Sequence, residues 1–211
     1  MPDTEPVAEP FTDPRQQHRA AMMGMYVFLG SEIMLFGGLF CVAAAMRMAH
    51  SAEIVHASHA LHFGIGGMNT AILLTSSLLV ALGVESAKTG QAGSSARRFA
   101  GASMSGLAFL APKAYEYRLE FAEGLLPVPG IEARYDTSIQ HLFMNLYLSA
   151  TALHAAHLTV GILLLLLLSF QTARGAIALP QRSIVLVVAG LYWHLVDVGL
   201  GLSLSGILFG R

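Results

Sequence analysis

The sequence predicts an all-α membrane protein, a polytopic bundle of five transmembrane helices. First, only 12% of the 211 residues are charged, 55% are hydrophobic and the mean hydropathy is +0.60, whereas about a quarter of the residues in a soluble domain are charged. Second, five apolar stretches reach the roughly 20 residues that a helix needs to cross a bilayer core. Third, the run GILLLLLLSF at 161–170 lacks the alternation of apolar and polar residues that marks transmembrane strands.

The apolar stretches place the expected spans in order along the chain. They are about 20–46, 62–84, 98–121, 138–170 and 183–209. Residues 1–19 are polar, acidic and rich in proline, so we expect a disordered tail ahead of a membrane domain covering 20–211. This tail lacks the basic start and apolar core of a cleavable signal peptide.

Basic residues indicate the orientation, because cytoplasmic segments of membrane proteins carry an excess of Lys and Arg. With the N-terminus inside and the C-terminus outside, the inner segments hold seven basic residues and the outer segments hold four. The inner ones are Arg15, Arg19, Lys88, Arg97, Arg98, Arg174 and Arg182, and the outer ones are Arg47, Arg118, Arg134 and Arg211. Lys113 is left within a span.

Net charge and cysteine content exclude several classes of function. The net charge of -1 argues against nucleic acid as a partner, since a binder of phosphate backbones needs an excess of Lys and Arg. A single cysteine, Cys41, excludes an intrachain disulfide and any four-cysteine metal site.

Glu32 is the most unusual residue of the first span, GMYVFLGSEIMLFGGLF at 24–40. A carboxylic acid at membrane depth is costly and marks a function or an internal partner. The residues alone leave open a proton relay, a contact with a lipid headgroup, and a structural hydrogen bond to a His or Ser on another helix.

Two histidines give the fourth span a polar stripe. Thr151, His154 and His157 are spaced three apart, so they share one face of a helix. The stripe is either a polar seam between helices, a haem site or a metal site. Zinc or iron bound by Glu32, His154 and His157 is chemically reasonable, although nothing in the sequence fixes the third ligand. We expect Glu32 to face this stripe or a bound lipid.

The last span and the end of the third span carry further polar residues. His194 and Asp197 are three apart. A catalytic dyad of these two lacks a nucleophile, so a hydrogen-bonded pair within the helix is the better interpretation. At the end of the third span we expect an interface anchor, because tyrosines and long charged side chains favour that depth; its residues are Lys113, Tyr115, Glu116, Tyr117 and Arg118.

Five segments in this order resemble the subunit III family of haem–copper terminal oxidases (cytochrome c oxidase subunit 3). They are GMYVFLGSEIMLFGGLF, NTAILLTSS, KAYEYRLEF, ATALHAAHLTVG and YWHLVDV, and together they cover about 22–198. The resemblance is to the short, five-helix bacterial form. It implies a non-catalytic subunit of the bacterial cytoplasmic membrane, with oxidase subunits I and II as partners, that docks on subunit I, binds phospholipid, and supports proton uptake and stability during oxygen reduction. It also implies that the haem and copper lie in the partner subunits and that this chain binds no cofactor besides lipid.

The resemblance extends to individual residues. Glu32 matches a buried glutamate of the family, His154 and His157 match its paired histidines, and Trp193, His194 and Asp197 match its W-H-x-V-D signature. The resemblance therefore implies that these six are lipid-binding or buried polar residues. The chain departs from the family at four positions, with Ala152 and Ala155 in place of glycines and Gly199 and Gly201 in place of bulky residues.

Three other functions remain open on the sequence. The same motifs resemble the subunit III-like accessory protein of bacterial nitric oxide reductase. An independent proton-coupled transporter would use Glu32, and a haem-binding electron carrier would use the histidines.

Overall fold

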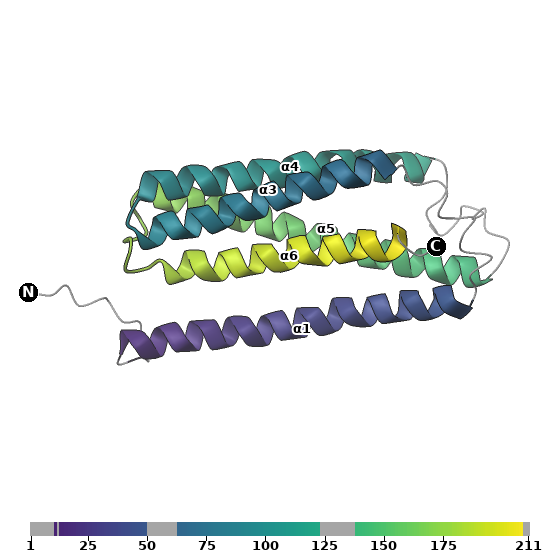
Figure 1. Ribbon diagram of the computed structural model, residues 1–211, viewed down its shortest axis with the longest axis horizontal. Coiled ribbons are helices and arrows are strands. Elements are labelled where there is room, and N and C mark those ends of the chain that lie inside the picture. Colours follow the sequence, from purple (N-terminus) through teal and green to yellow (C-terminus); the bar gives the residue numbers. More distant parts are fainter. Residues whose placement is uncertain (1–10, 12, 50–62, 123–137, 209–211) are drawn as a thin grey trace, which may run out of the picture.

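The computed structural model describes residue 11 and residues 13–49, 63–122 and 138–208. Within the helices, it leaves out the side chains of Arg47, 63–70 and 112–122, and most of those in 138–147 and 198–208. The described residues form five α-helices, which Figure 1 shows lying side by side along the long axis of the molecule. Their bounds are α1 Pro14–Ala49, α3 Phe63–Lys88, α4 Ala92–Ala122, α5 Ser138–Ala173 and α6 Ile184–Leu208.

The helices lie close to where the apolar stretches predicted them, and the largest differences are at the starts of α1 and α4, which begin at Pro14 and Ala92 where about 20 and 98 were expected. Residues 14–19, expected in the polar tail, form the first turns of this helix. Asp13 explains the early start, because its carboxylate accepts a 2.9 Å hydrogen bond from the backbone N–H of Arg15. An Asp cap followed by Pro at the first helical position is a favourable helix start. Residues 1–10 and 12 of the expected tail lie outside the described residues.

Length and composition support membrane residence. Three stretches are long and apolar enough to cross a bilayer, namely Pro14–Met46, Ala71–Lys88 and Leu148–Ala173, and Ile184–Asp197 is a shorter apolar stretch. The protein is therefore all-helical with three clear candidate spans in its described part. A crossing by all five helices, and the inside position of the N-terminus, stay predictions.

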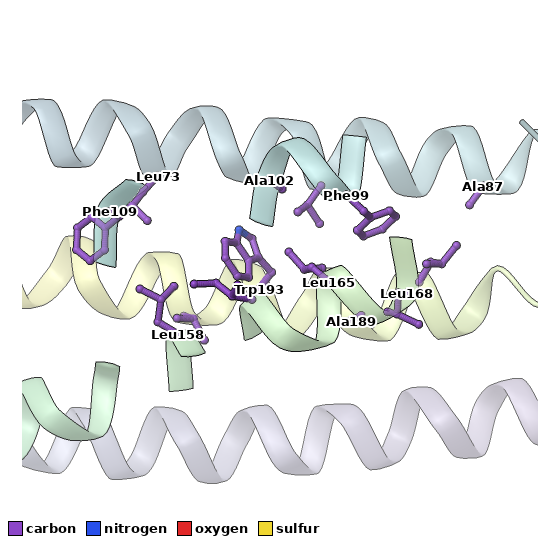
Figure 2. Packing of buried hydrophobic residues seen from close by; sticks show 14 of the residues in the cluster. Leu73, Ala87, Phe99, Ala102, Phe109, Leu158, Leu165, Leu168, Ala189 and Trp193 are labelled. Atoms are coloured by element: carbon purple, nitrogen blue, oxygen red, sulfur yellow. The ribbon is translucent and has the colours of Figure 1, made fainter. Parts of the chain in front are cut away.

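Helices α3, α4, α5 and α6 pack around one apolar core, whereas α1 lies along the outside, against α5 and α6 (Figure 1). Figure 2 shows the core side chains pointing into the space between α3, α4, α5 and α6. The helices meet around Leu73, Phe99, Phe109, Leu158, Leu165 and Trp193. By contrast, Met25 is the only buried hydrophobic residue among the described side chains of α1, and Met23 and Met34 are 71% and 79% exposed.

Trp193 is the centre of this core. The indole is fully buried and lies between two glycines, Gly106 of α4 and Gly161 of α5. A Cβ atom built on Gly106 would lie 2.8 Å from its ring, and one on Gly161 would lie 3.1 Å from it. Each glycine therefore leaves a slot that the tryptophan ring fills.

Two consecutive hydrogen bonds connect Trp193 to α3 and α4. The indole N–H of Trp193 donates to the hydroxyl of Ser76, at 3.0 Å. That hydroxyl donates in turn to the backbone carbonyl of Ala102, at 3.2 Å. One side chain of α6 is thereby fixed against all three of the other core helices.

Candidate functional site

Glu32 and His157 face each other between α1 and α5. The Oε2 atom of Glu32 lies 3.1 Å from Nε2 of His157, and the two side chains are 12% and 18% exposed. Oε2 has no aligned hydrogen bond to any described residue, so the contact has the distance of an ion pair. The expectation that Glu32 faces the histidine stripe is confirmed for His157.

The other ring nitrogen of His157 fixes how the ring is oriented. Nδ1 is 2.8 Å from the backbone carbonyl of Leu153. A carbonyl oxygen only accepts hydrogen bonds, so Nδ1 is the donor. This bond turns Nε2 toward the carboxyl group of Glu32.

Aromatic rings enclose the pair. Phe36 of α1 meets the rings of His154 and His157 edge-on, with centroids 6.3 and 5.5 Å away. The hydroxyl of Tyr192 on α6 donates to the carbonyl of His157 at 2.9 Å, and its ring packs on Phe28 with centroids 6.0 Å apart. Side chains of three helices, α1, α5 and α6, thus meet around the Glu32–His157 contact.

His194 and Asp197 do not form the expected pair within α6. Nδ1 of His194 lies 2.5 Å from the hydroxyl of Ser77 on α3. Both carboxylate oxygens of Asp197 are buried beside the side chains of Ser77 and Trp193, without an aligned hydrogen bond among the described residues. The expected hydrogen bond inside the helix is therefore wrong, because a serine on a neighbouring helix satisfies the histidine instead. These two residues lie against α3, away from the Glu32 pair.

The expected interface anchor lies near the end of α4. Lys113, Tyr115, Glu116, Tyr117 and Arg118 belong to this helix, but their side chains fall outside the described part of the structure. Their anchoring role stays a prediction.

A metal site finds no support in the described part of the chain. No three His, Cys, Asp or Glu side chains come close enough there to hold a metal ion. Among the candidate ligands, Glu32 and His157 are adjacent, while the ring of His154 meets the ring of Phe36.

Known proteins similar to this chain share one description. Cytochrome c oxidase subunit 3 of Thermostichus vulcanus is 28% identical over 84% of this chain and 81% of its own length. The subunit 3 of Corynebacterium diphtheriae is 28% identical over 83% of this chain and 81% of its own. That of Synechocystis sp. is 27% identical over 84% of this chain and 70% of its own. No family model matches the chain.

The chain is thus similar to cytochrome c oxidase subunit 3 proteins over more than four fifths of its length. This similarity agrees with the resemblance found in its motifs. Gly199, one of the four departures from the subunit 3 pattern, lies among the described residues. A Cβ on Gly199 would meet nothing within 4 Å, so the described surroundings leave room for the bulky residue that the family usually has there.

Sequence reasoning missed three residues of the site. Ser77, Phe36 and Tyr192 all contact a predicted histidine. In the sequence, Ser77 is one of several hydroxyl residues of its helix. Phe36 and Tyr192 look like ordinary packing residues of a membrane helix. Their roles depend on which helix lies opposite, and the sequence alone does not reveal that.

Proposed function

We propose that this chain is the non-catalytic subunit III of a respiratory haem–copper terminal oxidase in the bacterial cytoplasmic membrane. It docks on subunit I of a complex that also contains subunit II, binds phospholipid, and supports proton uptake and stability during oxygen reduction. The haem and copper belong to the partner subunits. The observation that carries this proposal is the Glu32–His157 pair, buried between α1 and α5 of a subunit 3 homologue.

The pair brings two ionisable groups together between two helices. Nδ1 of His157 donates to the carbonyl of Leu153, and the hydroxyl of Tyr192 donates to the backbone carbonyl of His157. Because ionisable groups at membrane depth mark a function or an internal partner, we assign the proposed part in proton uptake to this pair.

The exposed side of α1 supports contact with lipid. Large apolar side chains of this helix are mostly exposed, among them Val27, Ile33, Met34 and Val42. In a bilayer such a surface is covered by acyl chains or by another transmembrane helix. α1 thus offers an apolar outer face while Glu32 points to the inner side.

The proposal is tested with Glu32→Gln in the complex purified through a tag on this chain. We expect an unchanged visible haem spectrum and an initial turnover rate within about twofold of the wild type. We also expect faster loss of activity during sustained turnover, and less phospholipid retained per complex. The change removes the acid and keeps the size of the side chain.

Glu85→Gln is the matched control, because Glu85 is an exposed carboxylate at the end of α3. It should behave as the wild type in all three measurements. Loss of the haem signal in Glu32→Gln, or equal inactivation of both variants, would contradict the proposed role of the pair.

A further inference from the structure

A second group of polar side chains lies between α3 and α6, apart from the Glu32–His157 contact. These two helices lie side by side in the bundle (Figure 1). Ser77 belongs to α3, and His194 and Asp197 belong to α6. The part in proton uptake proposed for Glu32 and His157 leaves these residues without a role, although an ionisable group inside a membrane helix marks a function or an internal partner.

The three side chains follow one another as neighbours. Nδ1 of His194 lies 2.5 Å from the hydroxyl of Ser77. The carboxyl group of Asp197 lies beside the side chain of Ser77 and beside the indole of Trp193. The hydroxyl of Ser77 therefore links a carboxyl group to an imidazole, which are the side chains that most often exchange protons in proteins. We call Asp197, Ser77 and His194 the polar triplet.

Hydrogen-bond donors are scarce around Asp197. The indole N–H of Trp193 donates to the hydroxyl of Ser76, and that hydroxyl donates to the carbonyl of Ala102. Both carboxyl oxygens of Asp197 are buried without an aligned hydrogen bond among the described residues. An ionised carboxylate only accepts hydrogen bonds, whereas a protonated one also donates one. The protonated form of Asp197 therefore suits this site, because its O–H has the hydroxyl oxygen of Ser77 as an acceptor.

The charged groups of the described chain lie elsewhere. The described lysines and arginines lie near the end of the bundle that holds the α3–α4 turn, whereas Asp197 lies in the middle of α6. The described side chains of α3 ahead of Glu85 include neither an acid nor a base.

The helices α1 and α5, which also pack against α6, carry their own polar group. Glu32 and His157 contact each other, and His154 meets the ring of Phe36. His194 is therefore the titratable partner of Asp197 within the polar triplet. An ionised carboxylate buried without a counter-charge is costly, which again favours a proton on this acid.

The two ends of the polar triplet differ in access. The ring of His194 is half-buried, whereas both carboxyl oxygens of Asp197 are enclosed. A proton that arrives at the imidazole reaches the acid through the hydroxyl of Ser77, which lies between them.

We propose that the polar triplet is a proton-binding site, in which Asp197 holds a proton and exchanges it with His194 through Ser77. In this step the O–H bond of Asp197 breaks as Oγ of Ser77 takes the proton, and the original hydroxyl hydrogen of Ser77 passes to Nδ1 of His194. The products are a carboxylate, an intact hydroxyl and an imidazolium, and the reverse step returns the proton to Asp197. The inference goes beyond the part in proton uptake proposed for Glu32 and His157, and it depends on no partner subunit.

Infrared spectroscopy of the full-length chain in lipid nanodiscs tests where the proton lies. Aspartate labelled with carbon-13 in its side-chain carboxyl group separates the bands of Asp3, Asp13, Asp136 and Asp197 from those of the glutamates. At pH about 7 an ordinary aspartate is ionised, so we expect one labelled carboxylic acid band in the wild type. That band should be absent in Asp197→Asn. The matched control is Asp13→Asn, at an exposed position before α1, and it should keep the band.

Exchange of the acid proton for deuterium tests the route. In deuterated water the labelled band shifts as Asp197 exchanges, and Ser77→Ala should slow this shift by about tenfold or more, because the link to His194 is lost. Thr75→Ala is the matched control on α3, since the hydroxyl of Thr75 donates to the carbonyl of Ala71 in its own helix. It should exchange at the wild-type rate.

The absence of a labelled acid band in the wild type would overturn the proposal, even if Asp197→Asn fails to fold. A band that persists in Asp197→Asn would also overturn it. Equal exchange rates in the wild type and Ser77→Ala would overturn the route through the serine. None of these results depends on which subunits purify with the chain, so the proposed oxidase role is judged separately.

Discussion

At the scale of single residues, the contact between Glu32 and His157 organises the site between α1 and α5. Nδ1 of His157 is occupied by the carbonyl of Leu153, which leaves Nε2 to face the carboxyl group of Glu32. The partner of Glu32 is thus His157, which lies 125 positions later in the chain. A substitution of either residue leaves the other buried without its partner.

A double-mutant cycle measures this dependence. Glu32→Gln and His157→Gln should each lower the free energy of unfolding in detergent by about 1–2 kcal/mol, because the remaining polar group stays buried. The double variant should cost about 1 kcal/mol less than the sum of the two. Thermal or denaturant unfolding followed by circular dichroism provides the values, and strictly additive losses would show that the pair is not coupled.

At the scale of the helices, glycines mark where elements touch and where they do not. Gly106 and Gly161 leave slots for Trp193, whereas Gly24, Gly30, Gly37 and Gly38 of α1 would meet nothing within 4 Å of a Cβ. The four-helix body α3–α6 is tightly packed around Trp193, and α1 lies outside it, against α5 and α6.

Glycine substitutions test this contrast. Gly106→Ala should lower the unfolding midpoint and cost about 1–3 kcal/mol, since the added methyl group collides with the buried indole. Gly30→Ala on α1 should be neutral or slightly stabilising, because alanine favours the helix more than glycine does. The two midpoints are compared in one detergent. Equal losses in both variants would argue against the packing around Trp193.

Serine substitutions test the hydrogen bonds between helices. Ser76→Ala breaks the chain from Trp193 to the carbonyl of Ala102 and should cost about 1–2 kcal/mol. Ser95→Ala should cost little, because the buried hydroxyl of Ser95 has no hydrogen-bond partner among the described residues. A larger loss for Ser95→Ala than for Ser76→Ala in an unfolding measurement would reverse this ranking.

At the scale of the whole molecule, composition was enough to predict the helical class and the positions of the helices. Apolar runs define helices locally, and Glu32 stood out because a carboxyl group inside such a run is costly. The partners of the polar residues were not predictable in the same way. Ser77 and His194 are 117 positions apart, and spacing along one helix wrongly favoured Asp197 as the partner.

The start of α1 and the two glycine slots were missed for related reasons. Asp13 and Pro14 form a favourable helix start, but the acidic, proline-rich composition around them favoured a tail. Gly106 and Gly161 read as ordinary small residues of membrane helices, because only the position of α6 reveals that a tryptophan fills the space beside them.

The central claim is that this subunit 3 homologue serves a redox complex without carrying a redox centre, and one purification tests it most directly. The tagged chain is isolated from native membranes in mild detergent, its co-purifying subunits are identified, and visible spectra are recorded for the complex and for the chain alone. We predict that subunits I and II of a haem–copper oxidase accompany it, that the complex shows haem absorption, and that the isolated chain is colourless. Haem absorption in the isolated chain, or a nitric oxide reductase in place of the oxidase, would contradict the claim.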